Sequence, residues 1–232
     1  MIELHQFAPA FNMPSPSPFC MKIEVFLRLA GLDYEAKVCP DPRKTPLGKL
    51  PFIKDGEKLV ADSSSIIEYL VQVHGADLDT GLSEDERAIA RAYTRMLEEH
   101  TYFGLLYCRW IDPAHWPTVR ETFFGDLPRP IRGLLSGFIQ GKIKRDLAGH
   151  GLGRHPPAEI YRRTAQDVAA VAAFLDGKLY FMGSEPTSID ATVYAFIGNM
   201  WEATLVTPLK DIVGKHSNLV AYCARMKQRC FG

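Results

Sequence analysis

The sequence predicts two domains of different fold class, an α/β domain followed by an all-helical bundle. In the first third of the chain, the spacing of apolar residues changes repeatedly between period two and helical period. From Ser83 onward the strand signal disappears, and long amphipathic segments follow. The segment between them, GADLDTGL, has little apolar surface to bury and is typical of a linker. We therefore predict an N-terminal domain at 1–75, a linker at 76–82 and a helical domain at 83–232.

The first domain begins with a strand, a helix and a second strand. Ile2 to Phe7 alternates as a strand does, and Phe19 to Ala30 carries apolar residues at helical spacing. Gly31 is expected to end that helix, because glycine adopts the left-handed conformation common at helix ends. Tyr34 to Cys39 is predicted to form the second strand.

A hairpin and a capped helix complete this domain. Pro51 to Ile53 and Lys58 to Ala61 flank a turn with Asp-Gly at its centre, which is a strong hairpin signal. Asp62 and Ser63 are N-capping residue types and predict a helix from Ser65 to His74.

The second half of the chain consists of segments with helical apolar spacing. They lie at 84–110, 118–147, 157–177, 188–204 and 217–229. Amphipathic segments of this length are expected to pack side by side as a bundle.

The composition excludes several function classes. Lys and Arg number 27 and Asp and Glu also number 27, so no net charge favours nucleic acid or anionic lipid. We see neither a secretory leader nor an apolar run of roughly 18 residues, and therefore expect a cytoplasmic protein without a membrane span. The five cysteines lack CxxC spacing, and no two of the seven histidines are spaced i, i+4, which argues against a metal site.

The motif SPSPFCMK is predicted to lie at the turn from the first strand into the first helix. The free amides and the dipole of a helix start favour an anion or a thiolate at this place. Ser17, followed by Pro18, is also an ordinary N-cap with proline at the first helical position. The two interpretations are compatible.

Two further motifs have both a binding and a structural interpretation. Pro51 opens a strand, where proline is unusual unless its peptide is cis or the strand lies at an edge; a trans proline is the commoner alternative. The Asp62-Ser63-Ser64-Ser65 run offers a carboxylate, hydroxyls and free amides, which suit the ammonium and carboxylate of an α-amino acid. A helix cap uses the same residue types.

The order of these motifs resembles the glutathione transferase superfamily. The matching elements are S-P-F-C-x-K after a strand, then L-P-F-I-K-D-G, then D-S-S-S-I-I-E-Y-L. The segments SPFCMK and RLAGLDYE look most like the failed-axon-connections and metaxin-related branch, including its bacterial members. Near the C-terminus, PTSIDA resembles the family's capping box, in which Thr187 caps a helix and Asp190 reaches back to an amide.

The resemblance implies a thioredoxin-like first domain, a helical second domain and glutathione as co-substrate. The backbone of Leu50, before a cis Pro51, is expected to pair with the cysteinyl part of glutathione. Asp62 and Ser63 are expected to hold the γ-glutamyl end. Asp62 is one methylene shorter than the Glu or Gln usual at this place in the family.

Two larger sets of side chains are predicted around the remainder of the ligands. The basic residues that could bind the glycyl carboxylate of glutathione are Lys49, Arg43 and Lys44. The residues expected to line an electrophile pocket between the domains are Tyr93, Met96, His100, Tyr102, Phe103 and Tyr107. The structural alternatives are a solvated basic loop for the first set and bundle core for the second.

The chemistry depends on which residue of the S-x-x-C turn is used. Ser17 would donate a hydrogen bond to the glutathione thiolate, which attacks an electrophilic carbon. Cys20 would instead form a mixed disulfide with glutathione, although a buried, unreactive cysteine is the commoner outcome. We predict a glutathione transferase, a homodimer by family resemblance, with a non-catalytic glutathione-binding adaptor and a thiol reductase as alternatives.

Overall fold

The N-terminal half is built on a four-stranded mixed sheet. The computed structural model describes residues 1–39 and 41–232. The strand order is β2-β1-β3-β4, with β1 parallel to β2 and the other neighbours antiparallel. The strands are β1 (Ile2–Gln6), β2 (Tyr34–Val38), β3 (Phe52–Asp55) and β4 (Lys58–Ala61). The predicted order of elements is confirmed.

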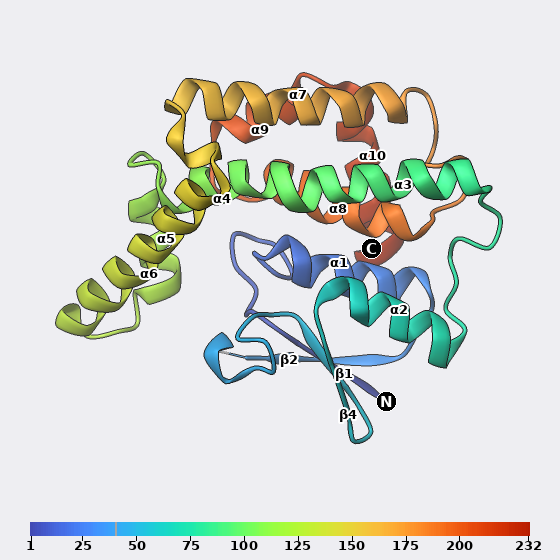
Figure 1. Ribbon diagram of the computed structural model, residues 1–232, viewed down its shortest axis with the longest axis horizontal. Helices are drawn as coiled ribbons and strands as arrows, with labels where there is room; N and C mark the ends of the chain where they lie inside the picture. The colour runs from blue at the N-terminus through green and yellow to red at the C-terminus, as the bar shows by residue number, and fades with distance from the viewer. Residues whose placement is uncertain (40) are drawn as a thin grey trace.

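Two helices, α1 (Pro18–Leu29) and α2 (Ser63–His74), lie between this sheet and the rest of the molecule (Figure 1). Both begin at their left ends in Figure 1, so their N-termini open toward the same side. Gly75 ends α2 with a φ of 66°, a conformation that glycine adopts without a steric cost. The sheet therefore presents two helix starts to one region.

The C-terminal half is helical throughout, as predicted. Its first helical segment contains a π-helical turn in its middle. In chain order the elements are α3 (Glu84–Met96), the π turn η2 (Leu97–Thr101), α4 (Tyr102–Trp110), α5 (Trp116–Phe124), α6 (Arg129–His150), α7 (Pro157–Leu175), α8 (Ser188–Trp201), α9 (Pro208–Gly214) and α10 (Ser217–Phe231). Two short 3₁₀ turns, Pro42–Lys44 and Leu152–Arg154, lie in connections.

Two details of the helical half differ from the prediction. A single helix at 118–147 is wrong, because the chain turns at 125–128 between α5 and α6. Pro128 lies just before α6 and cannot continue the hydrogen-bonding pattern of α5. The seven-residue α9 was not predicted, since it is too short to establish a helical period.

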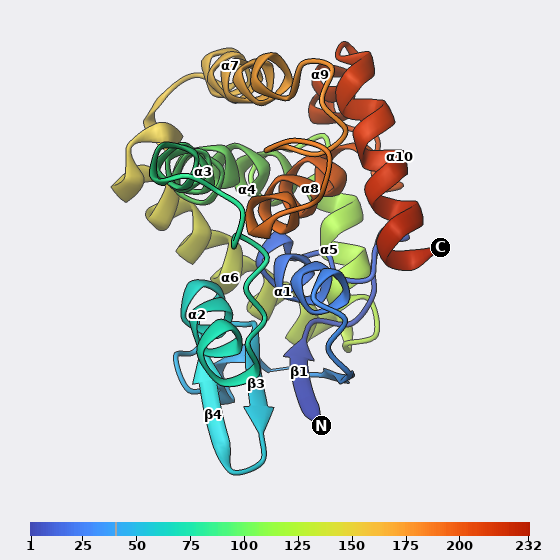
Figure 2. The same cartoon turned by 90° about the vertical axis from the view of Figure 1, so that its right-hand side faces the viewer.

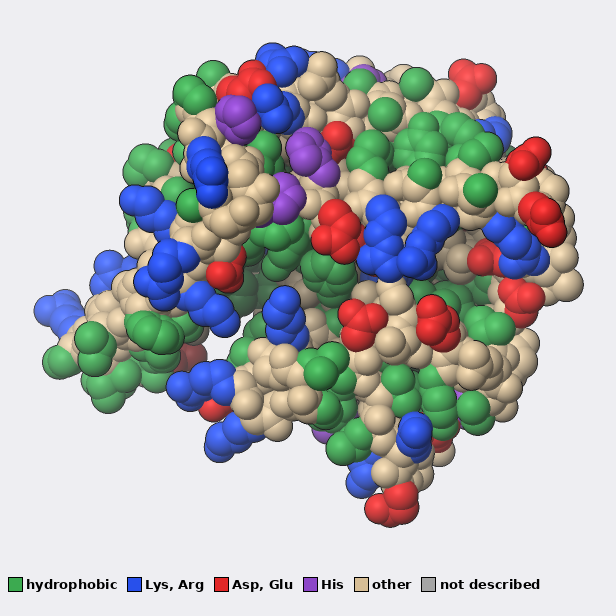
Figure 3. All heavy atoms as spheres, viewed as in Figure 1, with side chains coloured by type: hydrophobic (Ala, Val, Ile, Leu, Met, Phe, Trp, Pro, Cys, Tyr) green, Lys and Arg blue, Asp and Glu red, His purple; other side chains and the backbone are tan. Residues whose placement is uncertain are grey.

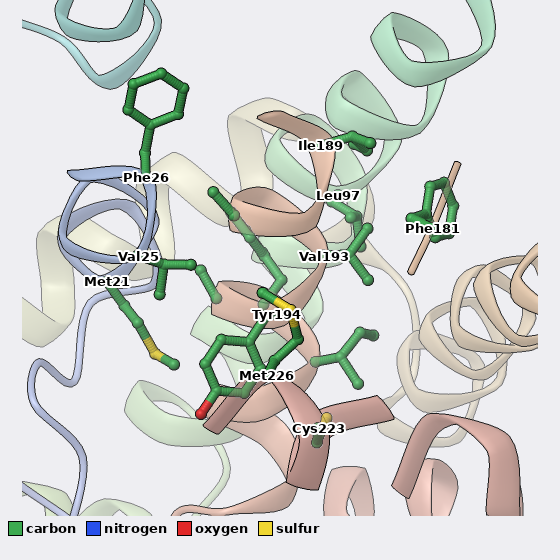
Figure 4. Packing of buried hydrophobic residues seen from close by; sticks show 14 of the residues in the cluster. Met21, Val25, Phe26, Leu97, Phe181, Ile189, Val193, Tyr194, Cys223 and Met226 are labelled. Carbon is green, nitrogen blue, oxygen red and sulfur yellow. The ribbon is translucent and has the colours of Figure 1, made fainter. Parts of the chain in front are cut away.

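One hydrophobic core joins the two halves. Helix α8 is buried from Ile189 to Met200 and packs against α1 and the outer helices (Figure 2). In Figure 4, Met21 and Val25 of α1 lie on the side of α8 that carries Tyr194, and all three belong to the same cluster as Met226 of α10. Because the core is continuous across the two halves, the division at 76–82 stays a prediction.

The capping box at the start of α8 is confirmed. The Asp190 carboxylate accepts hydrogen bonds from the Thr187 amide at 2.9 Å and from the Thr187 hydroxyl at 3.2 Å. It also accepts from the Phe181 amide at 2.8 Å and from the Tyr222 hydroxyl at 2.9 Å. This fully buried carboxylate ties the start of the central helix to two neighbouring segments.

Helices α5 and α6 project from the body as an arm (Figure 1). Figure 3 shows a hollow between this arm and the N-terminal half, with Lys and Arg side chains on both of its sides. Within the two described ranges, no helix combines the length and the apolar character that a membrane crossing needs.

Candidate functional site

The start of α1 places Ser17 where the sequence predicts it. Ser17 is the N-cap, and its Oγ accepts a hydrogen bond from the Cys20 amide at 3.4 Å. The Met21 amide donates to the Ser17 carbonyl oxygen at 3.0 Å, and Pro18 has no amide hydrogen. The Cys20 and Met21 amides thus have acceptors, and within the described residues the Phe19 amide of the first turn has none. Ser17 thus has a hydroxyl proton that its capping role does not use.

The Cys20 thiol lies on the inner side of the same turn. Its side chain is fully buried, and burial raises the pKa of the thiol to about 11. Hydrogen bonds from Ser17 and Ser15 act in the opposite direction but do not compensate for burial. At neutral pH Cys20 is therefore a protonated, enclosed thiol, which is the environment of a structural cysteine.

A buried arginine of α4 holds the loop just before Ser17. Arg109 Nη1 donates to the Pro16 carbonyl oxygen at 2.6 Å, and Nη2 donates to the backbone oxygen and the side-chain Oδ1 of Asn199 at 2.8 and 3.1 Å. The guanidinium also lies over the Phe11 ring at 5.7 Å. Arg109 therefore connects α4, α8 and the loop that enters α1.

The remaining predicted glutathione-binding residues lie in the N-terminal half. Leu50 and Pro51 precede β3, and Asp62 and Ser63 lie at the start of α2. The Leu50–Pro51 peptide is cis, as predicted, and directly precedes β3. Asp62 is exposed and caps α2, because its Oδ1 accepts from the Ser64 and Ser65 amides at 3.0 and 3.1 Å. Its φ of 76° is uncommon for a residue other than glycine, so the backbone is strained at this cap.

Ser63 has a buried partner that the sequence reasoning did not identify. Lys22 of α1 donates from Nζ to the Ser63 Oγ at 3.4 Å and to Glu98 Oε1 at 2.6 Å. The Lys22 and Glu98 side chains are only 3% and 4% exposed. Glu98 belongs to the π turn η2, so this ion pair connects both helix starts to the C-terminal half. Since the ammonium takes an acceptor site of Ser63, the serine proton is free for a ligand carboxylate.

The three basic residues of the connection between β2 and β3 have different environments. Lys44 and Lys49 are exposed. Arg43 makes a two-pronged contact with Asp41, at 2.8 Å from Nε and 2.9 Å from Nη2. Arg43 is thus paired with its neighbour, whereas the two lysines have exposed side chains.

The aromatic and polar set of the first long helical segment does not gather in one pocket. Tyr93 packs against Phe174 and Phe181 in the bundle core, with ring centroids 5.0 Å apart in both cases. Met96 packs against the same core, and Tyr107 against Tyr161. These three residues belong to the core of the bundle and not to a pocket between the domains.

Of the same set, only Tyr102 has a ring contact with the first turn of α1. Its ring meets Phe19 edge-on at 5.0 Å, and burial raises the pKa of its phenol to about 12. Phe103 instead stacks on His150 at 3.8 Å, and His100 Nδ1 lies 2.6 Å from Asp167 Oδ2. Tyr102 is therefore the member best placed beside the Ser17 turn.

The sequence reasoning missed Lys22, Glu98 and Arg109, although a signal existed for two of them. Lys22 interrupts the apolar run of α1, and Arg109 interrupts the apolar run LLYCRW of α4. A charge inside an apolar run is buried only when it finds hydrogen-bond partners. Glu98 had no such signal, because it lies in a segment with several charged residues.

The two halves of the chain match the two parts of one family. The sequence profile described as "Glutathione S-transferase N-terminal domain" matches residues 18–115. The profile described as "Glutathione S-transferase, C-terminal domain" matches residues 164–226. The isoprene-epoxide--glutathione S-transferase of Rhodococcus sp. (strain AD45) is 32% identical over 99% of this chain and 99% of its own length. The chain belongs to the glutathione S-transferase family.

Other relatives confirm the predicted branch. Failed axon connections of Drosophila melanogaster is 31% identical over 100% of this chain, which spans 58% of that protein's length. Metaxin-2 of Homo sapiens is 27% identical over 91% of this chain and 81% of its own length.

A solved structure confirms the fold. It is a glutathione S-transferase of Methylobacterium radiotolerans in complex with glutathione sulfonate, which aligns with a TM-score of 0.63 at 20% identity over 98% of this chain and 91% of its own. Membership of the family identifies glutathione as the co-substrate.

Proposed function

We propose that this protein is a glutathione transferase that joins the sulfur of glutathione to a small electrophile. The observation that carries the proposal is the geometry of Ser17. Its oxygen accepts the Cys20 amide, and its hydroxyl proton, which otherwise faces the neutral Cys20 thiol, can be donated instead to a sulfur anion at the start of α1. A serine in this state stabilises the thiolate, and the helix dipole acts in the same direction.

The reaction is a nucleophilic displacement. The glutathione thiol gives its proton to solvent, and a sulfur electron pair forms a bond to the electrophilic carbon. The bond from that carbon to its leaving group breaks and takes its electrons; with an epoxide the ring oxygen leaves as an alkoxide and takes a proton from water. The name of the Rhodococcus relative supports an epoxide as one electrophile to test.

The rest of glutathione is assigned to the second helix start. The Leu50 backbone takes the cysteinyl part, Asp62 takes the γ-glutamyl ammonium and the Ser63 hydroxyl takes the neighbouring carboxylate. Lys49 and Lys44 are preferred over Arg43 for the glycyl carboxylate, because Arg43 is paired with Asp41. Tyr102, whose ring contacts Phe19 in the first turn of α1, is assigned to the electrophile.

A glutathione-binding adaptor is the second function we consider. The similarity to Failed axon connections and to metaxin-2 favours it, because neither of those names describes a transferase. We do not propose the reductase, since the Cys20 thiol is enclosed and protonated. A cytoplasmic homodimer with domains at 1–75 and 83–232, joined by 76–82, remains part of the proposal; light scattering tests the dimer.

The test combines binding and turnover. Glutathione should raise the melting temperature in a concentration-dependent way, because a ligand that binds only the folded state stabilises it by RT ln(1 + [L]/Kd). The wild type should conjugate glutathione to an activated aryl halide or to an epoxide. Ser17→Ala should lower the rate at neutral pH by about 10- to 150-fold, the value of a hydrogen bond to a charged group. Ser184→Ala, an exposed serine far along the chain, is the matched control and should change nothing.

The outcomes separate the two functions. Glutathione binding without turnover across a panel of electrophiles would favour the adaptor. An absence of any thermal shift at millimolar glutathione would contradict both functions.

A further inference from the structure

Arg109 is a buried cation whose hydrogen-bond partners are all neutral. The residue is 6% exposed, and its three acceptors are the oxygens of Pro16 and Asn199 already described. Across residues 1–39 and 41–232, no carboxylate forms an ion pair with it. Burial lowers the pKa of its guanidinium to about 10, so it keeps its charge at neutral pH.

The titratable groups around Arg109 do not neutralise it. Tyr102 and Cys108 on its own helix interact with its charge, and α1 brings Cys20 close to Tyr102. Burial raises the pKa of each of these three groups, so all are neutral near pH 7. The carboxylates that act on those groups are Glu24 on Cys20, Asp112 on Cys108 and Asp146 on Tyr102. The Arg109 charge is therefore available to a bound anion.

The position of Arg109 directs this charge toward the Ser17 turn. Its shortest hydrogen bond goes to the carbonyl of Pro16, the residue just before the N-cap of α1. Asn199 of α8 holds the other guanidinium nitrogen, so the group cannot swing away without breaking two further hydrogen bonds. The Arg109 guanidinium is therefore held at a fixed position relative to the Ser17 turn.

We propose that Arg109 is a positioning residue that fixes the Ser17 turn and supplies the buried positive charge which stabilises the sulfur anion of glutathione bound there. The inference rests on the proposed function. A fixed charge in a water-poor site acts more strongly than the same charge in solvent, and it acts on the anion without touching it. Replacing the charge should therefore raise the pH at which bound glutathione ionises, while the affinity for glutathione with a protonated thiol stays the same.

The experiment compares three variants by the ultraviolet absorbance of bound glutathione thiolate as a function of pH. Arg109→Met removes the charge. Asn199→Asp keeps the arginine but places a carboxylate where Oδ1 accepts its hydrogen bond, so the charge is cancelled in place. Arg120→Met removes the same charge from the exposed face of α5 and serves as the control.

We expect the ionisation midpoint to rise by about 1 to 2 pH units in Arg109→Met and Asn199→Asp. At pH 7 their rates should fall by up to about 10-fold for each pH unit of the rise, because fewer bound molecules carry the thiolate, and should recover toward pH 9. Arg120→Met should match the wild type.

Unchanged midpoints in both site variants would overturn the inference, and so would a rate loss that high pH does not restore. If Arg109→Met fails to fold, Asn199→Asp decides the question alone. A wild type that binds no glutathione would defeat the proposed function and this inference together, whereas normal wild-type ionisation with unshifted variants would defeat only the inference.

Discussion

Two buried cations reach the candidate site from the two halves of the molecule, and they differ in what surrounds their charge. Lys22 of α1 is paired with Glu98 at 2.6 Å. Arg109 of α4 is held by three neutral oxygens. A charge taken out of water costs several kcal/mol, which a close counter-ion offsets and carbonyl dipoles offset only in part. The charge of Lys22 is therefore balanced by Glu98 within the folded protein. The charge of Arg109 is not balanced in this way and can act on a bound ligand.

Asp190 shows that a buried ion held by neutral groups can also be purely structural. Its carboxylate is held by the amides of Phe181 and Thr187 and by the hydroxyl of Tyr222. Yet Asp190 lies at the start of α8, surrounded by packed core. What distinguishes Arg109 is its contact with the residue before Ser17, so location and charge together carry the argument.

The largest effect should come from breaking the Lys22–Glu98 pair. Glu98→Leu leaves the Lys22 ammonium buried without a counter-ion, and should lower the free energy of unfolding by about 3–5 kcal/mol. Urea denaturation at pH 7 measures this loss. The double variant Lys22→Met/Glu98→Leu removes both charges and should regain most of the stability. Equal losses in the single and double variants would show that packing, not charge, explains the effect.

The next effect concerns Asp190. Asp190→Asn removes the charge and turns one acceptor into a donor that faces another donor, so we expect a loss of about 1–3 kcal/mol in urea denaturation. Unlike Arg109→Met, this variant should leave the ionisation midpoint of bound glutathione unchanged. A shift in that midpoint would mean that general loosening of the fold affects the thiolate, and would weaken the comparison.

These three charged residues also show what the sequence could predict. The Thr187 to Asp190 capping box was predictable, because its partners are three residues apart and the motif is local. The Ser17 and Asp62 caps were predictable for the same reason, whereas the cis Pro51 was expected only from the family resemblance. The fold class followed from the change of apolar period near residue 83.

The contacts of Lys22 and Arg109 were not predictable, because their partners are distant in sequence. Lys22 and Glu98 are separated by 76 residues, and Arg109 and Pro16 by 93. Only packing of α1 against the C-terminal half brings them together. For the same reason, the sequence could not tell which of the residues expected in the electrophile pocket lie in the core and which lie beside α1. Helical spacing alone does not say which face of a helix meets α1.

A smaller effect is expected for Asp62, which lies at the exposed edge of the proposed γ-glutamyl site. Asp62→Asn keeps an oxygen that can cap α2 and tolerates the positive φ, but it removes the charge. An exposed ion pair contributes up to about 1 kcal/mol, so glutathione affinity should fall about 2- to 5-fold in calorimetry. Unaltered affinity would leave Asp62 with its capping role only.

The smallest effect on turnover should come from Cys20, although it shares a turn with Ser17. With the pKa of its thiol at about 11, only about one molecule in 10,000 carries the Cys20 thiolate at pH 7. Cys20→Ala should therefore conjugate glutathione at nearly the wild-type rate. Iodoacetamide should label Cys39 first, because Cys39 is the only cysteine of the described ranges that is not buried.

The same shift sets the pH dependence of stability. Burial raises the pKa of the Cys20 thiol from 9.0 to about 11, so between those pH values the unfolded chain loses a proton that the folded protein keeps. Stability should decline as pH rises through this window, and Cys20→Ala should reduce the decline. Urea denaturation of the two proteins at pH 8 and pH 10 measures it. Rapid labelling of Cys20 at pH 7, or an equal decline in the free energy of unfolding of both proteins, would show that the thiol is open to solvent. Cys20 would then again be a candidate catalytic residue beside Ser17.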